Sequence, residues 1–259
     1  MSEPLFVTFD GPILTITLDR PERRNPLSLE TIRALRAAVE DSDAGVIVIA
    51  SSGPAFSAGH DLREMRERDS EFYDELFREC GELMLAIHRA PQPVIAQVQG
   101  VATAAGCQLV AACDLAVASE AATFATPGVR IGLFCTTPMV EVARSIGRKR
   151  AMQMLLTGDP IDAPTAADWG LVNEVVPGAD LAAATMDLAT RIATASPTVL
   201  ATGKRAFHAN LDLGLDAAYE HAGGVMAHCS VAEDAQEGFA AFLEKRTPTW
   251  TSRSASRSG

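Results

Sequence analysis

The sequence predicts an α/β fold in which a layered strand–helix core is followed by a mostly helical last third. Short, wholly apolar, β-branched runs at residues 46–50 and 94–98 are typical of strands buried on both faces. Segments with helical apolar spacing alternate with these strands up to residue 118, as in layered α/β proteins. From Pro138 onward the helical pattern dominates.

The composition fits a globular protein and limits its partners. Of the 259 residues, 47% are hydrophobic and 21% are charged. A compact fold of this size buries about three quarters of the surface that its unfolded chain exposes. This apolar content excludes intrinsic disorder for most of the length. Lys and Arg number 22 against 33 Asp and Glu, a net charge of −11. We therefore expect no nucleic-acid binding, which normally requires a basic surface.

The first forty residues predict a β-hairpin followed by a helix. Residues 6–9 and 13–18 are short β-rich runs on either side of the turn at 10–12. After a loop punctuated by prolines, apolar residues from 29 to 39 repeat at helical spacing, and Ser28 is the expected N-cap.

The strand–helix cycle then repeats. The strand at 46–50 is followed by a loop of small residues and a helix that ends at the Pro-Gln-Pro of 91–93. The strand at 94–98 leads into a second small-residue turn, a short helix around 108–112 and a strand at 115–118. The last third contains predicted helices at 139–145, 149–156, 163–169, 181–195, 198–211 and 234–244, with one strand at 171–176.

This pattern suggests a core of residues 1–195, a helical region of residues 196–250 and a disordered tail of residues 251–259.

The longest apolar stretch, residues 100–118, is interrupted by polar residues, so we expect no membrane span. Acidic residues interrupt the first twenty positions, so we expect no secretory signal there. The five cysteines are an odd number without a CxxC pair, which favours a cytoplasmic protein with reduced thiols.

Two turns share a pattern that points to chemistry. In each, a buried strand runs into very small residues and then directly into a helix, at 56–62 and at 100–108. Small side chains let a ligand approach the backbone, and the first amides of a helix are unpaired donors at its positive end. Two such turns can each direct one N–H at a single oxygen and so form an oxyanion hole.

These segments resemble the crotonase (enoyl-CoA hydratase/isomerase) superfamily. Phe56-Ser57-Ala58-Gly59-His60-Asp61-Leu62 resembles its first oxyanion segment, and Gly106-Cys107-Gln108-Leu109 resembles its second. Further similar runs follow in the family's order at 124–127, 155–158, 169–177 and 237–246. The resemblance implies a ClpP-like spiral of β-β-α units with a C-terminal helical trimerisation region. It also implies a homotrimer or hexamer that binds acyl-CoA.

Residue by residue, the resemblance implies that the backbone N–H groups of His60 and Ala105 bind the thioester oxygen. The other substrate or CoA contacts that it implies are Arg23, Arg24, Ala58, Leu62, Gly106, Gly128 and Lys245. Coenzyme A enters as the substrate's thioester, and no separate cofactor is expected. No metal is expected either, because the five histidines lack a metal-binding spacing.

The sequence departs from the family at both general acid–base positions. Family hydratases use two glutamates to handle the water, and the matching positions here are Gln108 and Gly128. A carboxamide cannot accept the proton, and glycine has no side chain. Glu120 and Glu141 lie nearby in sequence but not at matching positions. Loss of one general acid–base group lowers the rate by about 10²–10⁴, so we expect ordinary hydration to be slow.

Several alternatives stay open. Decarboxylation or thioester cleavage can use the same oxyanion hole, and a non-catalytic acyl-CoA binder needs no catalyst. Cys135 is a further catalytic candidate, because it falls where a decarboxylase of the family places a tyrosine; a buried apolar thiol is the simpler interpretation. We expect His60 to act through its amide, with its ring at the mouth of the pocket, and a catalytic ring is the alternative. Asp61 is expected to cap the next helix, and Ser57 lacks the first glycine of a nucleophile elbow.

Overall fold

The computed structural model describes residues 3–251 and contains two β-sheets. The six-stranded sheet has the order β1-β2-β3-β5-β7-β10, and the four-stranded sheet has the order β4-β6-β8-β9. The first sheet consists of β1 (Leu5–Asp10), β2 (Ile13–Leu18), β3 (Val46–Ser51), β5 (Val94–Val98), β7 (Leu115–Ser119) and β10 (Glu174–Val176). The second consists of β4 (Ala55–Ser57), β6 (Val101–Thr103), β8 (Thr123–Ala125) and β9 (Ile161–Asp162).

The predicted hairpin and buried parallel strands are confirmed. β1 and β2 pair in antiparallel register, Leu5 opposite Leu18, and every other pairing in the six-stranded sheet is parallel. Residues 46–49 of β3 have no exposed surface. Successive side chains of a strand point to opposite faces, so the two faces of β3 enter two different cores.

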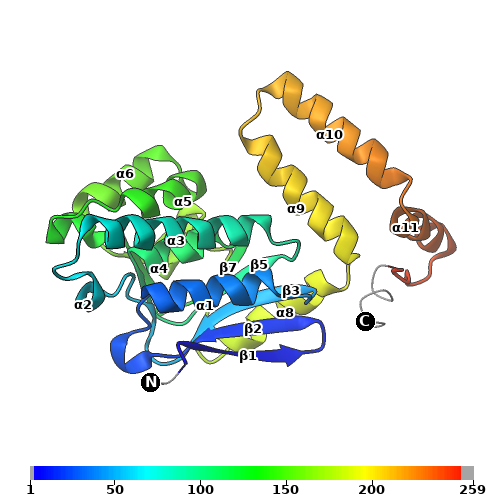
Figure 1. Ribbon diagram of the computed structural model, residues 1–259. Coiled ribbons are helices and arrows are strands. Elements are labelled where there is room, and N and C mark those ends of the chain that lie inside the picture. Colours follow the sequence, from blue (N-terminus) through cyan, green and yellow to red (C-terminus); the bar gives the residue numbers. More distant parts are fainter. Residues whose placement is uncertain (1–2, 252–259) are drawn as a thin grey trace.

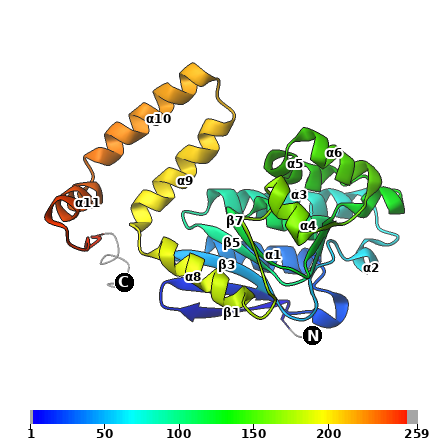
Figure 2. The ribbon, with the colours of Figure 1, turned by 180° about the vertical axis from the view of Figure 1, so that it is seen from behind.

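Helices cover both faces of this sheet. The helices of the body are α1 (Leu29–Glu40), α2 (Leu62–Met65), α3 (Ser70–Arg89), α4 (Ala105–Ala112), α5 (Thr136–Ile146), α6 (Arg148–Thr157), α7 (Ala163–Trp169) and α8 (Leu181–Ala193). α1 and α3 pack together over one face, and α8 lies on the other, as Figures 1 and 2 show from opposite sides. Ile47 and Ile49 face the first core, whereas Val46 and Val48 face Leu181 of α8. The predicted α/β layering is confirmed.

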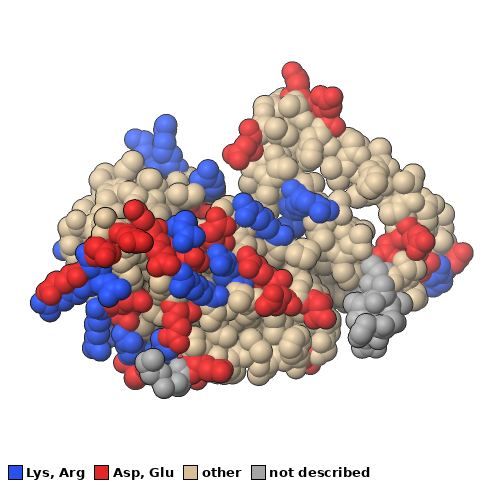
Figure 3. Space-filling view, viewed as in Figure 1, with Lys and Arg blue, Asp and Glu red and all other residues tan. Residues whose placement is uncertain are grey.

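Three helices form a C-terminal arm: α9 (Pro197–Leu211), α10 (Leu215–Ser230) and α11 (Glu233–Glu244). The arm extends from the body in both views (Figures 1 and 2), and α9 and α10 contain no buried residue. Figure 3 shows charges of both signs over the body and a largely uncharged surface along the arm. An arm of this kind leaves apolar side chains of its helices in solvent.

The sequence predicted no helix at α10. The helix contains Gly223 and Gly224, each of which disfavours a helix by about 1 kcal/mol, and it has no buried stripe to mark its period. The predicted strand at 171–176 is shorter, and strands β4, β6, β8 and β9 of two or three residues went unpredicted.

Two further predictions concern the division of the chain into regions and the absence of a membrane-spanning helix. The boundary between residues 195 and 196 stays a prediction, and apart from Thr251 the predicted tail lies outside the described residues. No helix in residues 3–251 is both long enough and apolar enough to cross a membrane.

Candidate functional site

The two small-residue turns lie in direct contact. β4 and β6 are parallel neighbours, with Ala55 opposite Val101, so the turns that follow them meet at the same edge of the second sheet. Gly59 has a φ of +82°, and a Cβ on it would lie 2.8 Å from the Thr103 carbonyl oxygen and 3.2 Å from the Ala105 nitrogen. Only glycine allows this backbone conformation and this close approach.

Both turns present a free amide at this junction. Neither His60 N–H nor Ala105 N–H donates to a protein acceptor within the described part of the chain. Ala105 is the first residue of α4, so its N–H lies at the positive end of that helix. The preceding Ala104 has a φ of +52°, a strained conformation of the kind found at functional sites. A Cβ on Gly106 would lie 2.5 Å from the Ser57 carbonyl oxygen, so α4 rests directly on β4.

Gln108 lies one turn further along α4 with its side chain buried. It is 3% exposed, and its Oε1 accepts a hydrogen bond from the Cys80 thiol of α3 at 3.8 Å. Burial raises the pKa of Cys80 to about 12, so the thiol stays protonated and donates. The carboxamide oxygen is therefore held by a neutral donor.

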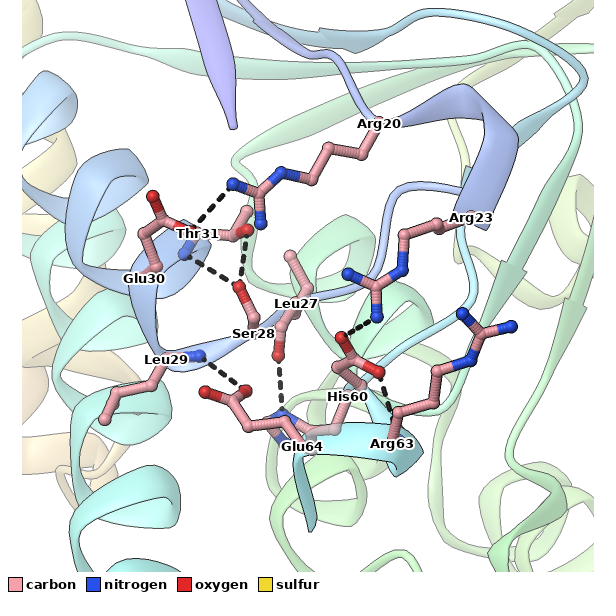
Figure 4. A network of polar contacts seen from close by, with 11 residues as sticks. Arg20, Arg23, Leu27, Ser28, Leu29, Glu30, Thr31, His60, Arg63 and Glu64 are labelled. Atoms are coloured by element: carbon pink, nitrogen blue, oxygen red, sulfur yellow. Dashed lines mark hydrogen bonds and ion pairs between the residues drawn. The ribbon is translucent and has the colours of Figure 1, made fainter. Parts of the chain in front are cut away.

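The His60 side chain is half-buried, and the expected position of its ring at the mouth of a pocket stays a prediction. It packs edge-on against Phe77 of α3 with 5.5 Å between ring centroids. Its Nδ1 lies 3.2 Å from the Leu27 carbonyl oxygen (Figure 4). Burial lowers the pKa of the imidazole, which keeps the ring neutral near pH 7. Phe77 and Cys80 share one face of α3, so the ring and Gln108 contact the same wall.

The position of the family's second glutamate is closed to any side chain. A Cβ on Gly128, in the 3₁₀ turn η2 (Pro127–Ile131), would lie 2.0 Å from the Leu133 carbonyl oxygen and 2.8 Å from Cys135 Sγ. Gly128 N–H donates to Cys135 Sγ at 3.3 Å, and burial raises the pKa of that thiol. Glu120 is exposed, and Glu141 bonds His88 at 3.0 Å on the side that faces α9. Neither glutamate therefore replaces the missing one.

The predicted CoA-binding residues divide into two groups. Near the first turn, the Arg23 guanidinium forms an ion pair with Asp61, which also caps α2 as predicted by accepting from Arg63 N–H at 3.1 Å. Ala58 N–H donates to the Arg24 carbonyl oxygen at 2.9 Å, which ties the arginine loop to the turn (Figure 4 shows Arg23 and Arg63 beside it).

Two residues lie further out. Leu62 is 56% exposed at the start of α2, where it can border a ligand. Lys245 ends α11 of the arm, on the far side of the molecule from α2 in both views (Figures 1 and 2). The chain therefore brings Arg23, Arg24, Ala58 and Leu62 together but does not bring Lys245 to them.

Comparison with known proteins identifies the family. A family model described as enoyl-CoA hydratase/isomerase matches residues 8–253. The chain belongs to this family. The mouse protein named "Enoyl-CoA hydratase domain-containing protein 3, mitochondrial" is 46% identical over 247 residues, which cover 93% of this chain and 82% of the relative. The 2,3-dehydroadipyl-CoA hydratase of Escherichia coli is 34% identical and is covered over its whole length, with 98% of this chain.

The solved structures agree with this assignment. The crystal structure of human enoyl Coenzyme A hydratase domain-containing protein 3 matches with a TM-score of 0.93 at 45% identity, covering 95% of this chain and 100% of that chain. The predicted crotonase-family fold is confirmed. The segments Ala104–Gln108 and Gly132–Cys135 predict a similarity to enoyl-CoA hydratase domain-containing protein 3, and this similarity is also confirmed.

The expectation of a cytoplasmic protein is wrong. The relatives from mouse, zebrafish (Danio rerio) and human are all named mitochondrial. The inference had rested on reduced thiols, and a reduced cysteine is compatible with more than one reducing compartment.

Sequence reasoning missed three components of this family's site. Phe77 and Cys80 lie in the predicted helix that ends at 91–93, and nothing in its helical pattern shows that Phe77 contacts His60 or that Cys80 contacts Gln108. The Leu133 carbonyl leaves no trace in a sequence, because every residue has one. Residues 3–251 contain no cluster of His, Cys, Asp and Glu suited to a metal ion.

Proposed function

We propose that the protein binds acyl-CoA thioesters in fatty-acid or acyl-CoA metabolism and stabilises a thioester enolate between the amides of His60 and Ala105. The observation that carries this proposal is the contact of the Gly59 turn with Ala105, which brings two unpaired N–H groups to one place. Each well-placed donor to an oxyanion contributes about 3–4 kcal/mol to the transition state. The reaction class is the lyase or isomerase chemistry of the family.

Ordinary hydration is slow in this proposal. Gln108 can orient a water but cannot take its proton, and the Gly128 position has no room for a carboxylate. The same observations favour a second candidate, a non-catalytic acyl-CoA binder, since neither matching position carries a carboxylate and the neighbouring Cys80, Cys135 and His60 are held in their neutral forms by burial.

A pair of ligands tests the oxyanion hole without any substitution. Butyryl-CoA has the thioester carbonyl, and S-butyl-CoA, a thioether, lacks it. Two hydrogen bonds to the carbonyl should make butyryl-CoA bind about tenfold more tightly in calorimetry. Equal affinity would show that the amides do not meet the carbonyl.

Variants and turnover complete the test. Gly59→Ala forces the turns apart and should abolish the preference for the thioester, whereas Gly81→Ala in α3, with nothing within 4 Å of the new Cβ, should keep it. Crotonyl-CoA hydration should be at least about 10² slower than that of ordinary family hydratases. Hydration within tenfold of those enzymes would contradict the assignment of Gln108 and Gly128. Binding without turnover of any acyl-CoA would favour the second candidate.

The arm suggests that copies of the chain associate as a homotrimer or hexamer. Its most exposed apolar residues have 74–84% of their surface in solvent: Leu215, Tyr219, Val231, Phe242 and Leu243. Burial of such residues is worth about 1.5–3 kcal/mol each. In an oligomer, Lys245 of one copy can reach the CoA phosphates of another. Sedimentation should show three or six copies, and a monomer at micromolar concentration would reject this assembly.

A further inference from the structure

A chain of titratable side chains lies where the arm meets the body, away from the oxyanion turns. α9 lies beside the end of α3 in both views (Figures 1 and 2), and a cavity of about 1300 Å³ lies between α9 and the body. Five side chains on the wall of this cavity contact one another in sequence: Lys204, Asp114, His208, His88 and Glu141. Because α9 contains no buried residue, such polar contacts matter for its attachment to the body.

Two residues of α9, one helical turn apart, make the contacts with the body. Lys204 Nζ donates to two backbone carbonyl oxygens of the body at 2.7 and 2.9 Å, and it lies 2.6 Å from Asp114 Oδ2. Beyond Lys204, the hydrogen bonds and ion pairs that join α9 to the body in the described chain all involve His208. The outer half of α9, residues 205–211, therefore depends on His208 for its polar attachment.

The contact between the two histidines holds a single proton. His88 Nε2 lies 3.0 Å from Glu141 Oε2, and a carboxylate oxygen only accepts, so this nitrogen carries a proton. The other ring nitrogen, His88 Nδ1, faces His208 Nε2 at 3.4 Å. A hydrogen bond between these two nitrogens needs a proton on one and a lone pair on the other. It therefore persists while at most one ring is charged. When both rings are charged, two N–H groups face each other and the bond is lost.

The surroundings of the pair accept one added proton more readily than two. Asp114 Oδ1 lies 3.6 Å from His208 Nε2, so each ring has a carboxylate beside it, and the Lys204 ammonium already neutralises part of that charge. The other ionisable groups on the cavity wall are Arg89, Cys113, Arg144, Arg205 and Asp212. Three of these are arginines, and burial raises the pKa of the Cys113 thiol, which keeps it neutral. A second ring charge therefore finds little compensation.

The order of the two protonation steps sets the pH range. Burial and the neighbouring His88 lower the pKa of His208, and Asp114 opposes this shift only in part. A histidine whose pKa is lowered by folding is neutral above about pH 6.5 and gains its proton below that value. Because the two rings interact, their protons are taken up in two separate steps, and the second step falls at the lower pH.

We propose that the contact between His88 and His208 is a pH-dependent attachment of the arm, and that the second proton taken up by the pair releases the outer half of α9 from the body. A lysine ammonium does not titrate in this range, so Lys204 keeps the first half of α9 in place. Since α9 leads into α10 and α11, the position of the arm changes as the pH falls from about 6.5 to 5. This inference is independent of the proposed acyl-CoA function.

Hydrogen–deuterium exchange of the wild-type chain tests the proposal at about pH 7.5 and about pH 5.5, with rates corrected for the intrinsic pH dependence of amide exchange. Residues 205–211 should exchange about tenfold faster at the lower pH, because a helix end without tertiary contacts frays. α1, which has a buried apolar face in the body, should exchange equally at both values. Equal protection of residues 205–211 at the two pH values overturns the proposal. An equal loss of protection in α1 also overturns it, since the chain then opens as a whole.

A substitution at each of two histidines of the arm assigns the effect. His208→Gln keeps an N–H donor near the position of Nε2 and cannot be protonated near pH 6, so residues 205–211 should stay protected at both pH values. His228→Gln, the same change at an exposed histidine of α10, should retain the wild-type pH dependence. A full pH dependence in His208→Gln overturns the assignment to the histidine pair. Circular dichroism checks that both variants are folded, and the wild-type comparison holds without them.

Discussion

Substitution of Gly128 by alanine should destabilise the protein strongly for so small a change. The new Cβ would lie 2.0 Å from the Leu133 carbonyl oxygen, whereas Cβ atoms essentially never approach other atoms closer than 3.0 Å. One of the two backbone segments must therefore move by roughly 1 Å, which also breaks the hydrogen bond from Gly128 N–H to Cys135 Sγ. Overpacking of this kind costs about 1–3 kcal/mol, and loss of a weak hydrogen bond adds about 0.5 kcal/mol.

Thermal unfolding measures the effect. At about 2–4 °C per kcal/mol for a chain of this size, a loss of about 3 kcal/mol lowers Tm by about 6–12 °C. Gly81→Ala is the matched control, because its Cβ has nothing within 4 Å in the middle of α3; it should raise Tm slightly by reducing the entropy of the unfolded chain. Cys135→Ala should not rescue Gly128→Ala, since the nearest atom belongs to the backbone.

A second substitution, Gly128→Glu, tests the effect of this position on activity. It should unfold at least as easily as Gly128→Ala and should gain no crotonyl-CoA hydration, because the backbone itself excludes the side chain. A Gly128→Ala variant that melts within about 1 °C of wild type would refute the reasoning, and so would hydration gained by Gly128→Glu at unchanged stability.

Three further predictions concern other sites. Gln108→Glu is nearly isosteric and should raise the rate of crotonyl-CoA hydration by no more than about 10²-fold. Its pH–rate profile should show a carboxyl pKa raised by burial. An unchanged rate would show that residue 108 takes no part in the reaction. The lowered pKa values of His60 and His208 mean that the unfolded chain binds more protons below about pH 6.5; the free energy of unfolding in urea should therefore fall as pH drops from 6.5 to 5, less steeply in His60→Phe. Lys204→Met leaves Asp114 without the Lys204 Nζ that lies 2.6 Å from its Oδ2, and should cost about 3 kcal/mol in denaturant unfolding, with part recovered in Lys204→Met/Asp114→Asn.

The sequence predicted the β/α core and the two small-residue turns because their signals are local. An apolar β-branched run such as residues 46–49 can hardly be anything but a buried strand, and Gly59 and Gly106 mark places where backbones touch. α10 was not predicted because none of its residues is buried within the described chain, so its sequence shows no apolar stripe with helical spacing. A helix without a buried face in its own chain lacks the regular apolar spacing by which a helix is predicted.

The side-chain part of the site was only half predictable for a different reason. Gln108 and Gly128 were found because a sequence shows which residue stands at a position. What fixes their roles is the Cys80 thiol on Gln108 Oε1 and the Leu133 carbonyl against Gly128. The first contact joins positions 28 apart in the chain, and the second is a close approach within one tight turn, whose geometry the residue types do not show. The contacts of the His60 ring could not be predicted either, because its partners Leu27 and Phe77 are 33 and 17 positions away in the sequence.

In the proposed function, two separate devices keep charge away from the acyl end of the site. The Cys80 thiol donates to the Gln108 carboxamide, and the Leu133 carbonyl oxygen closes the Gly128 position. Because each device rests on a different segment, no single substitution converts the site into an ordinary two-glutamate hydratase. The oxyanion amides do not depend on these devices, since they are main-chain groups held by the contact of two turns.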